Sequence, residues 1–159
     1  MSTAVVVTSG KGGTGKTSLT GGVSSCLAAL GRRVLCIDMD IGLRNLDISL
    51  GLTDRALMDF TDVLEGRCSL KRAAVPHPVI KNLYLLTAPL TLPPGISEER
   101  MKAFLRTARE QYDYILMDSP AGLGEGFRLA VCGADRAIVV STTDASALRD
   151  AQRVVSQLS

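Results

Sequence analysis

Residues 10–17 of the chain read Gly-Lys-Gly-Gly-Thr-Gly-Lys-Thr, and this stretch decides the fold. It fits the pattern G-x-x-x-x-G-K-[ST], in which glycines let backbone N–H groups converge on phosphate oxygens. Residues 4–8 form a short β-branched apolar run that predicts a buried strand. After the loop, five apolar residues recur at helical spacing and predict the buried side of a helix: Leu19, Val23, Cys26, Leu27 and Leu30. A glycine-rich loop between a strand and a helix N-terminus predicts a phosphate site.

The loop also predicts the contacts to a nucleotide and its metal. We expect Lys16 to reach the β- and γ-phosphates as a point charge and the Thr17 hydroxyl to ligate Mg²⁺. The residues predicted to hold the nucleotide are Gly10, Lys11, Gly12, Gly13, Thr14, Gly15, Lys16, Thr17 and Ser18.

Strands and helices alternate along the rest of the chain. Strands are predicted at residues 33–38, 82–87, 114–118 and 137–141, and helices at residues 54–64, after Ser97 and from residue 145 onward. Residues 89–95 hold three prolines and predict a loop. The alternation predicts an α/β fold, with a mostly parallel sheet covered by helices on both faces in the three-layer, Rossmann-like manner of P-loop NTPases. We expect one domain over residues 1–159, with the strand at 137–141 as a sheet edge.

Carboxylates follow two of the predicted strands. Asp118 comes after four apolar residues, as in the Walker B pattern, and is expected to hold the hydration shell of Mg²⁺. Asp38 and Asp40 end the strand at 33–38, and one of them could orient the attacking water. A strand-end cap facing solvent is the alternative role for each. The glycine-rich residues 119–124 are either a second loop that senses the γ-phosphate or an ordinary turn.

Composition fits a compact cytoplasmic domain. The 159 residues are 46% hydrophobic, and a formal net charge of +2 is too small to indicate nucleic acid or an anionic membrane as a partner. His77 lies between two prolines and is predicted to be a loop residue, not a ligand. Because the first predicted strand lies at the N-terminus and no apolar run reaches membrane length, we expect neither a targeting segment nor a membrane span in these residues. The cysteines are scattered, which favours a reducing compartment and core positions: Cys26, Cys36, Cys68 and Cys132.

The second lysine of the loop, Lys11, makes residues 11–17 resemble the deviant Walker A motif of the MinD/ParA ATPases. Residues 37–47 (Ile-Asp-Met-Asp-Ile-Gly-Leu-Arg-Asn-Leu-Asp) are similar to the MinD branch, as are residues 118–122 and 147–150. The resemblance covers all 159 residues. It departs from the family at Thr14, where valine is common, and in stopping at Ser159, where such chains continue to an adenine pocket and a membrane-targeting helix. The chain therefore resembles a C-terminally truncated member.

The resemblance implies an ATP- and Mg²⁺-dependent switch in cell division. Such proteins form an ATP-bound homodimer, recruit a division inhibitor and are released by an ATPase-activating partner, with peripheral membrane contact through the C-terminal segment. It assigns catalytic roles to Lys11, which crosses to the partner's nucleotide, and to Lys16 and the water-positioning Asp40. The implied metal site comprises Thr17, Asp38 and Asp118. Residues assigned weakly to partner contact are Arg44, Asn45 and Asp150.

Four other functions remain open. A ParA-type partition ATPase would share both lysines but needs a basic DNA-binding surface. A relative that handles a metal or a cluster would use paired cysteines, for which Cys132 lacks an evident companion. A small-molecule kinase would not need Lys11. A binding module that has lost catalysis and keeps only its surface for a partner protein would bind that partner without hydrolysing nucleotide.

Overall fold

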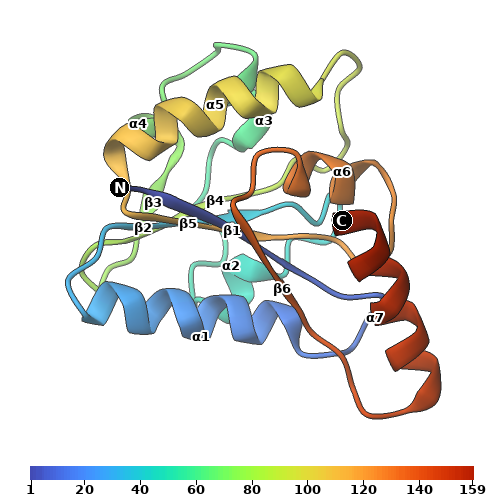
Figure 1. Cartoon of the computed structure of the whole chain (residues 1–159). Coiled ribbons are helices and arrows are strands. Elements are labelled where there is room, and N and C mark those ends of the chain that lie inside the picture. Colours follow the sequence, from blue (N-terminus) through green and yellow to red (C-terminus); the bar gives the residue numbers. More distant parts are fainter.

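The computed structural model describes residues 1–159 and holds one six-stranded sheet with helices on both faces (Figure 1). The strand order is β3-β4-β2-β5-β1-β6, and every neighbouring pair is parallel except β3 and β4. The predicted α/β fold is therefore confirmed. The strands are β1 (Thr3–Thr8), β2 (Val34–Asp38), β3 (Val75–Pro76), β4 (Leu83–Leu86), β5 (Tyr114–Asp118) and β6 (Arg136–Val139).

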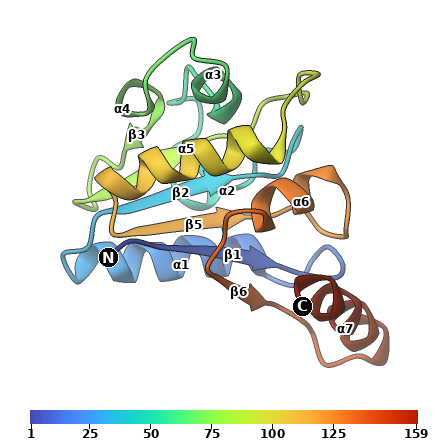
Figure 2. The same cartoon turned by 45° about the horizontal axis from the view of Figure 1, so that its top comes forward.

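Figure 2 shows the helices as separate layers above and below the sheet. Helices α3, α4, α5 and α6 cover one face, α1 and α2 cover the other, and α7 lies beside the edge strand β6. None of the helices combines the length and the apolar character needed to cross a bilayer. The helices are α1 (Lys16–Ala29), α2 (Leu46–Ser49), α3 (Phe60–Leu64), α4 (Leu70–Ala73), α5 (Glu98–Gln111), α6 (Glu125–Val131) and α7 (Ala145–Leu158).

The core has two parts because both faces of the central strands are buried. Alternate residues of β2 divide between them: Leu35 and Ile37 join the cluster under α3 to α6, whereas Val34 and Cys36 join the cluster on the α1 side. This two-sided burial explains why the strands are continuous apolar runs in the sequence.

The predicted helix at residues 54–64 is wrong in its first half, since α3 begins only at Phe60. The Asp59 carboxylate accepts hydrogen bonds from the backbone N–H groups of Thr61 and Asp62, which fixes the helix start there. Asp54 has a left-handed φ of 60°, and Leu57 is 93% exposed. The capping hydrogen bonds of Asp59 therefore decide where the helix starts, although apolar residues at helical spacing lie before it.

The predicted buried side of α1 is wrong for three of its five residues. Leu19 and Leu30 are exposed, as is Cys26, and only Val23 and Leu27 pack partly against the core. The helix instead buries small residues, because it lies close to the sheet and to α2. A Cβ on Gly21 would stand 3.1 Å from the Ser49 Oγ. The buried residues of α1 are Lys16, Thr20, Gly21, Ser24 and Ala28.

Strand β6 forms the sheet edge predicted for residues 137–141, but it starts one residue earlier and ends at Val139. Its first three residues are exposed. Helix α7 lies beside this edge, and Ala147 and Val154 are its two buried residues. Leu148 and Val155, two apolar residues of the same helix, are about half exposed.

Candidate nucleotide site

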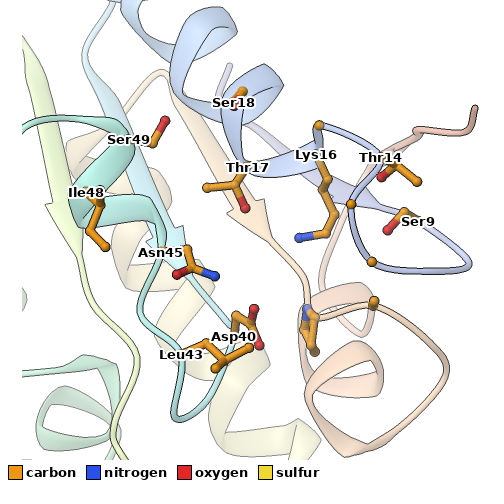
Figure 3. Close-up of a pocket in the computed structure, with 15 residues that line it drawn as sticks. Ser9, Thr14, Lys16, Thr17, Ser18, Asp40, Leu43, Asn45, Ile48 and Ser49 are labelled. Atoms are coloured by element: carbon orange, nitrogen blue, oxygen red, sulfur yellow. The ribbon is translucent and has the colours of Figure 1, made fainter.

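A cavity of about 730 Å³ lies at the carboxyl ends of the parallel strands, under the glycine-rich loop (Figure 3). Residues 12–18 of that loop form one wall. The loop after β2 contributes Asp40, Leu43 and Asn45 to the wall opposite, with Ile48 and Ser49 of α2. Ser9, Pro120 and Ala121 complete the lining. A parallel sheet binds ligands at this edge, so the location agrees with the predicted site.

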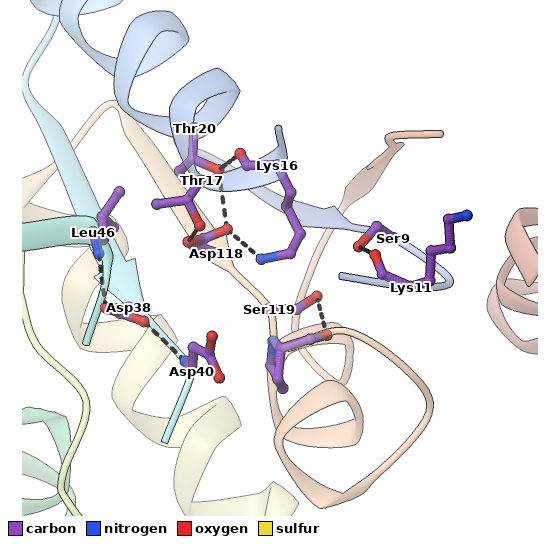
Figure 4. Close-up of polar contacts among 11 residues, drawn as sticks. Ser9, Lys11, Lys16, Thr17, Thr20, Asp38, Asp40, Leu46, Asp118 and Ser119 are labelled. Atoms are coloured by element: carbon purple, nitrogen blue, oxygen red, sulfur yellow. Dashed lines mark hydrogen bonds and ion pairs between the residues drawn. The ribbon is translucent and has the colours of Figure 1, made fainter. Parts of the chain in front are cut away.

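Asp118, at the end of β5, is the most heavily contacted acid beneath the loop (Figure 4). Its Oδ1 lies 3.0 Å from the Lys16 Nζ, and its Oδ2 accepts a 2.8 Å hydrogen bond from the Thr17 hydroxyl. The Thr20 Oγ1 lies 3.3 Å from the Oδ1 and 2.9 Å from the backbone oxygen of Lys16. The side chains of Lys16 and Asp118 are 9% and 1% exposed, so this is a buried ion pair.

The loop backbone takes the turns that its glycines allow. Gly13 and Gly15 have φ of 75° and 87°, in the left-handed region that side chains disfavour. Gly15 directly precedes α1 and supplies no side-chain cap. The first N–H groups of α1 therefore have no capping side chain, which leaves the positive end of a 14-residue helix at the cavity.

The outer part of the loop packs against α7 instead of the cavity. The Lys11 Nζ lies 3.2 and 3.3 Å from the two carboxylate oxygens of Asp144, the residue that caps α7. Hydrogen bonds from the Thr142 hydroxyl, the Ala147 N–H and Lys11 lower the pKa of Asp144. A Cβ on Gly10 would stand 2.3 Å from the carbonyl carbon of Asp150, so loop and helix are in direct contact.

Asp38 and Asp40 occupy different places although both follow β2. Asp40 lines the cavity, and its partial burial raises its pKa. Asp38 is fully buried and is paired in register with Asp118 on the neighbouring strand. Burial raises the pKa of Asp38 to about 6, against two backbone N–H donors that lower it.

The structure thus brings residues 12–18, Asp40 and Asp118 together, places Asp38 beneath them, and places Gly10 and Lys11 at the α7 side. The sequence interpretation missed two residues. Thr20 lies one helical turn after Lys16, a spacing that could have predicted its contact with Asp118. Asp144 lies 133 residues from Lys11, and no local pattern marks that pairing.

The remaining candidates lie elsewhere. His77 is in a loop, where its Nδ1 accepts hydrogen bonds from the N–H groups of Val79 and Ile80 and its Nε2 lies 3.0 Å from the Leu50 oxygen. Of the cysteines only Cys36 is fully buried, so the predicted core position is wrong for the exposed Cys26.

Fold and site together define a P-loop nucleotide-binding protein with a second lysine in its loop. A family model described as an AAA domain, AAA_31, matches residues 2–159, and the chain belongs to that family.

Comparison with single proteins confirms the predicted resemblance to MinD. The chain is 44% identical to the septum site-determining protein MinD of Bacillus subtilis over 99% of its own length and 60% of the relative's. A solved MinC:MinD cell division complex from Aquifex aeolicus is similar with a TM-score of 0.90 and 45% identity, covering 99% of this chain and 63% of that one. A Pyrococcus horikoshii MinD complexed with Mg-ADP has a TM-score of 0.85 at 31% identity, covering 99% and 65%. The chain thus spans about 60% of the length of the curated relatives it matches.

Proposed function

We propose that this chain binds Mg²⁺–ATP in the 730 Å³ cavity and hydrolyses it, as the P-loop domain of a MinD-like regulator of cell division. The observation that carries the proposal is the convergence of Lys16 and Thr17 on Asp118, within 3.0 Å, directly under the glycine-rich loop. Mg-ADP in the similar Pyrococcus horikoshii MinD supports the choice of ligand.

The donor set fits a magnesium ion. The Thr17 Oγ1 and the Asp118 Oδ2 lie 2.8 Å apart, and a hydroxyl beside a carboxylate is an oxygen pair of the kind that Mg²⁺ takes in phosphate sites. A bound Mg²⁺ would neutralise charge on the phosphates. Lys16, now paired with Asp118, would turn its ammonium to the phosphates. Asp40, across the cavity, would orient the attacking water.

Lys11 would act in a second copy of the chain, in an ATP-dependent homodimer. Its side chain and that of Asp144 are 38% and 51% exposed, so separating this ion pair costs little. A lysine released toward a partner's phosphates would stabilise transferring charge only in the dimer, as an arginine finger does. The solved MinC:MinD complex supports a division inhibitor as a partner of that dimer, and an ATPase-activating protein would complete the cycle.

Titration with a fluorescent ATP analogue, with and without Mg²⁺, tests the proposal. We expect saturable, Mg²⁺-dependent binding that Lys16→Ala abolishes and that Lys11→Ala leaves largely intact. Size-exclusion chromatography with ATP should show a dimer. Absence of Mg²⁺-dependent binding to the unaltered chain would refute the proposed site, and unchanged partner-stimulated hydrolysis in Lys11→Ala would refute the two-lysine mechanism.

A further inference from the structure

The carboxylate of Asp38 is used by backbone groups and does not line the cavity (Figure 4). Its Oδ1 accepts a 2.9 Å hydrogen bond from the N–H of Asp40, and its Oδ2 accepts a 3.1 Å hydrogen bond from the N–H of Leu46. Each carboxylate oxygen therefore already has a donor within the protein, and hydrogen bonds to a charged acceptor are the stronger kind.

These two N–H groups mark the two ends of one loop. Asp40 is the first residue of the loop to line the cavity, and Leu46 is the first residue of α2, whose Ile48 and Ser49 also line it. The carboxylate of Asp38 thus closes residues 40–46 into a ring. By holding both ends of the 40–46 loop, Asp38 also restrains the direction in which Asp40 and Asn45 face the cavity.

Besides Asp38 and the buried side chain of Leu46, two hydrogen bonds tie this loop to the segment after β4. The Gly42 N–H donates to the Pro89 oxygen at 3.1 Å, and the Arg44 Nε donates to the Ala88 oxygen at 2.7 Å. Gly42 and Arg44 both have left-handed φ, 88° and 48°, a conformation that arginine adopts only when its surroundings impose it. Leu43, at the tip, is 67% exposed and gives no apolar anchor.

We propose that Asp38 is a positioning residue that holds the 40–46 loop and the start of α2 in place, and that it does not ligate the metal. The catalytic consequence rests on the proposed ATP site, because the residue that it positions is Asp40. The structural part, the closure of the loop, holds independently of any ligand.

Hydrogen exchange on the nucleotide-free chain tests the structural part. In Asp38→Ala we expect the amides of Asp40 and Leu46 to exchange about ten- to a hundredfold faster, because each loses a charged acceptor. Asp38→Asn keeps one acceptor oxygen, so the combined acceleration of exchange at the two amides should be intermediate. This variant keeps the measurement decisive should the alanine variant not fold. Asp47→Asn is the matched control, since this half-buried carboxylate of α2 accepts from the N–H of Ile48 and from neither of the two amides, which should stay unchanged. Unchanged exchange in both Asp38 variants would overturn the proposal.

Titration of Mg²⁺ against the binding of a fluorescent ATP analogue tests the catalytic part. A positioning role predicts that Asp38→Asn leaves the half-saturating Mg²⁺ concentration within about twofold of the unaltered chain and lowers kcat about tenfold or more, since a small misplacement of a catalytic group is costly. A rise of about tenfold in half-saturating Mg²⁺ would show that Asp38 is a metal ligand and would overturn the proposal. If the unaltered chain binds no nucleotide, the proposed function fails, while the hydrogen-exchange result still decides the role of Asp38.

Discussion

The buried pair of Lys16 and Asp118 makes a quantitative prediction for the nucleotide-free chain. Its atoms are 3.0 Å apart, and the two side chains are 9% and 1% exposed. Removing one partner of a buried pair leaves an uncompensated charge and costs about 3–5 kcal/mol. We expect the lower end of this range for Asp118→Leu, because Lys16 also borders the cavity and its ammonium can turn toward water there. In Lys16→Met, the hydroxyl of Thr17 still donates to Asp118, so the carboxylate keeps one hydrogen bond.

A double-mutant cycle separates the pair from these side effects. Combining Lys16→Met with Asp118→Leu removes both charges. The double variant should therefore lose about 2–3 kcal/mol less unfolding free energy than the two single variants lose in sum. Urea denaturation without nucleotide or metal gives the four unfolding free energies. The matched control is the exposed pair of Lys11 and Asp144, for which the same cycle should give a much smaller coupling. A buried coupling no larger than the exposed one would refute the ion-pair geometry on which the site rests.

Three further changes should alter stability in directions that the contacts fix, each measured by denaturation. Gly10→Ala should cost about 1–3 kcal/mol and expose α7 to hydrogen exchange, because the new Cβ would meet the backbone of Asp150 at 2.3 Å; unchanged α7 protection would contradict this. Gly22→Ala should stabilise by about 0.5–1 kcal/mol, because this helical glycine is exposed and a Cβ there meets nothing within 4 Å; a loss would contradict it. Asp135→Asn should lower stability near neutral pH but progressively less below the ordinary Asp pKa of 3.8. The hydrogen bond from Arg109 lowers the pKa of Asp135, so its contribution is present above that value and is lost as the pH falls through the lowered pKa. A pH-independent difference would contradict the pairing.

The sequence was sufficient for the five parallel strands and the loop, because each rests on a local pattern, but not for the two-residue strand β3. The apolar runs ending in carboxylates predicted β2 and β5 closely. The short helix α2 was not predicted, since four residues carry no periodicity and the helix is fixed by Asp38 through the N–H of Leu46. The buried side of α1 was mispredicted because close packing against α2 selects small residues such as Gly21 over large apolar ones. Tertiary contacts, not local preference, decide both the position of α2 and the buried side of α1.

The different surroundings of Asp38 and Asp118 follow from one feature of the sheet. The two residues are partners in register on neighbouring parallel strands. Each lies two residues after a side chain that points to the α1 side, Cys36 on β2 and Leu116 on β5, and side chains two apart on a strand share a face. Both carboxylates therefore face the same helix layer. Asp118 meets the first turn of α1, where the residues present a lysine and hydroxyls, whereas Asp38 meets the first turn of α2, which presents only a backbone N–H. The charge of Asp118 adds to the burial that raises the pKa of Asp38, so Asp38 needs donors of its own. The Lys16 ammonium beside Asp118 can turn to phosphates and leave the carboxylate to a metal, whereas the backbone donors of Asp38 cannot leave without opening the loop. This difference supports the proposal that Asp118 serves the chemistry and Asp38 the position of the loop.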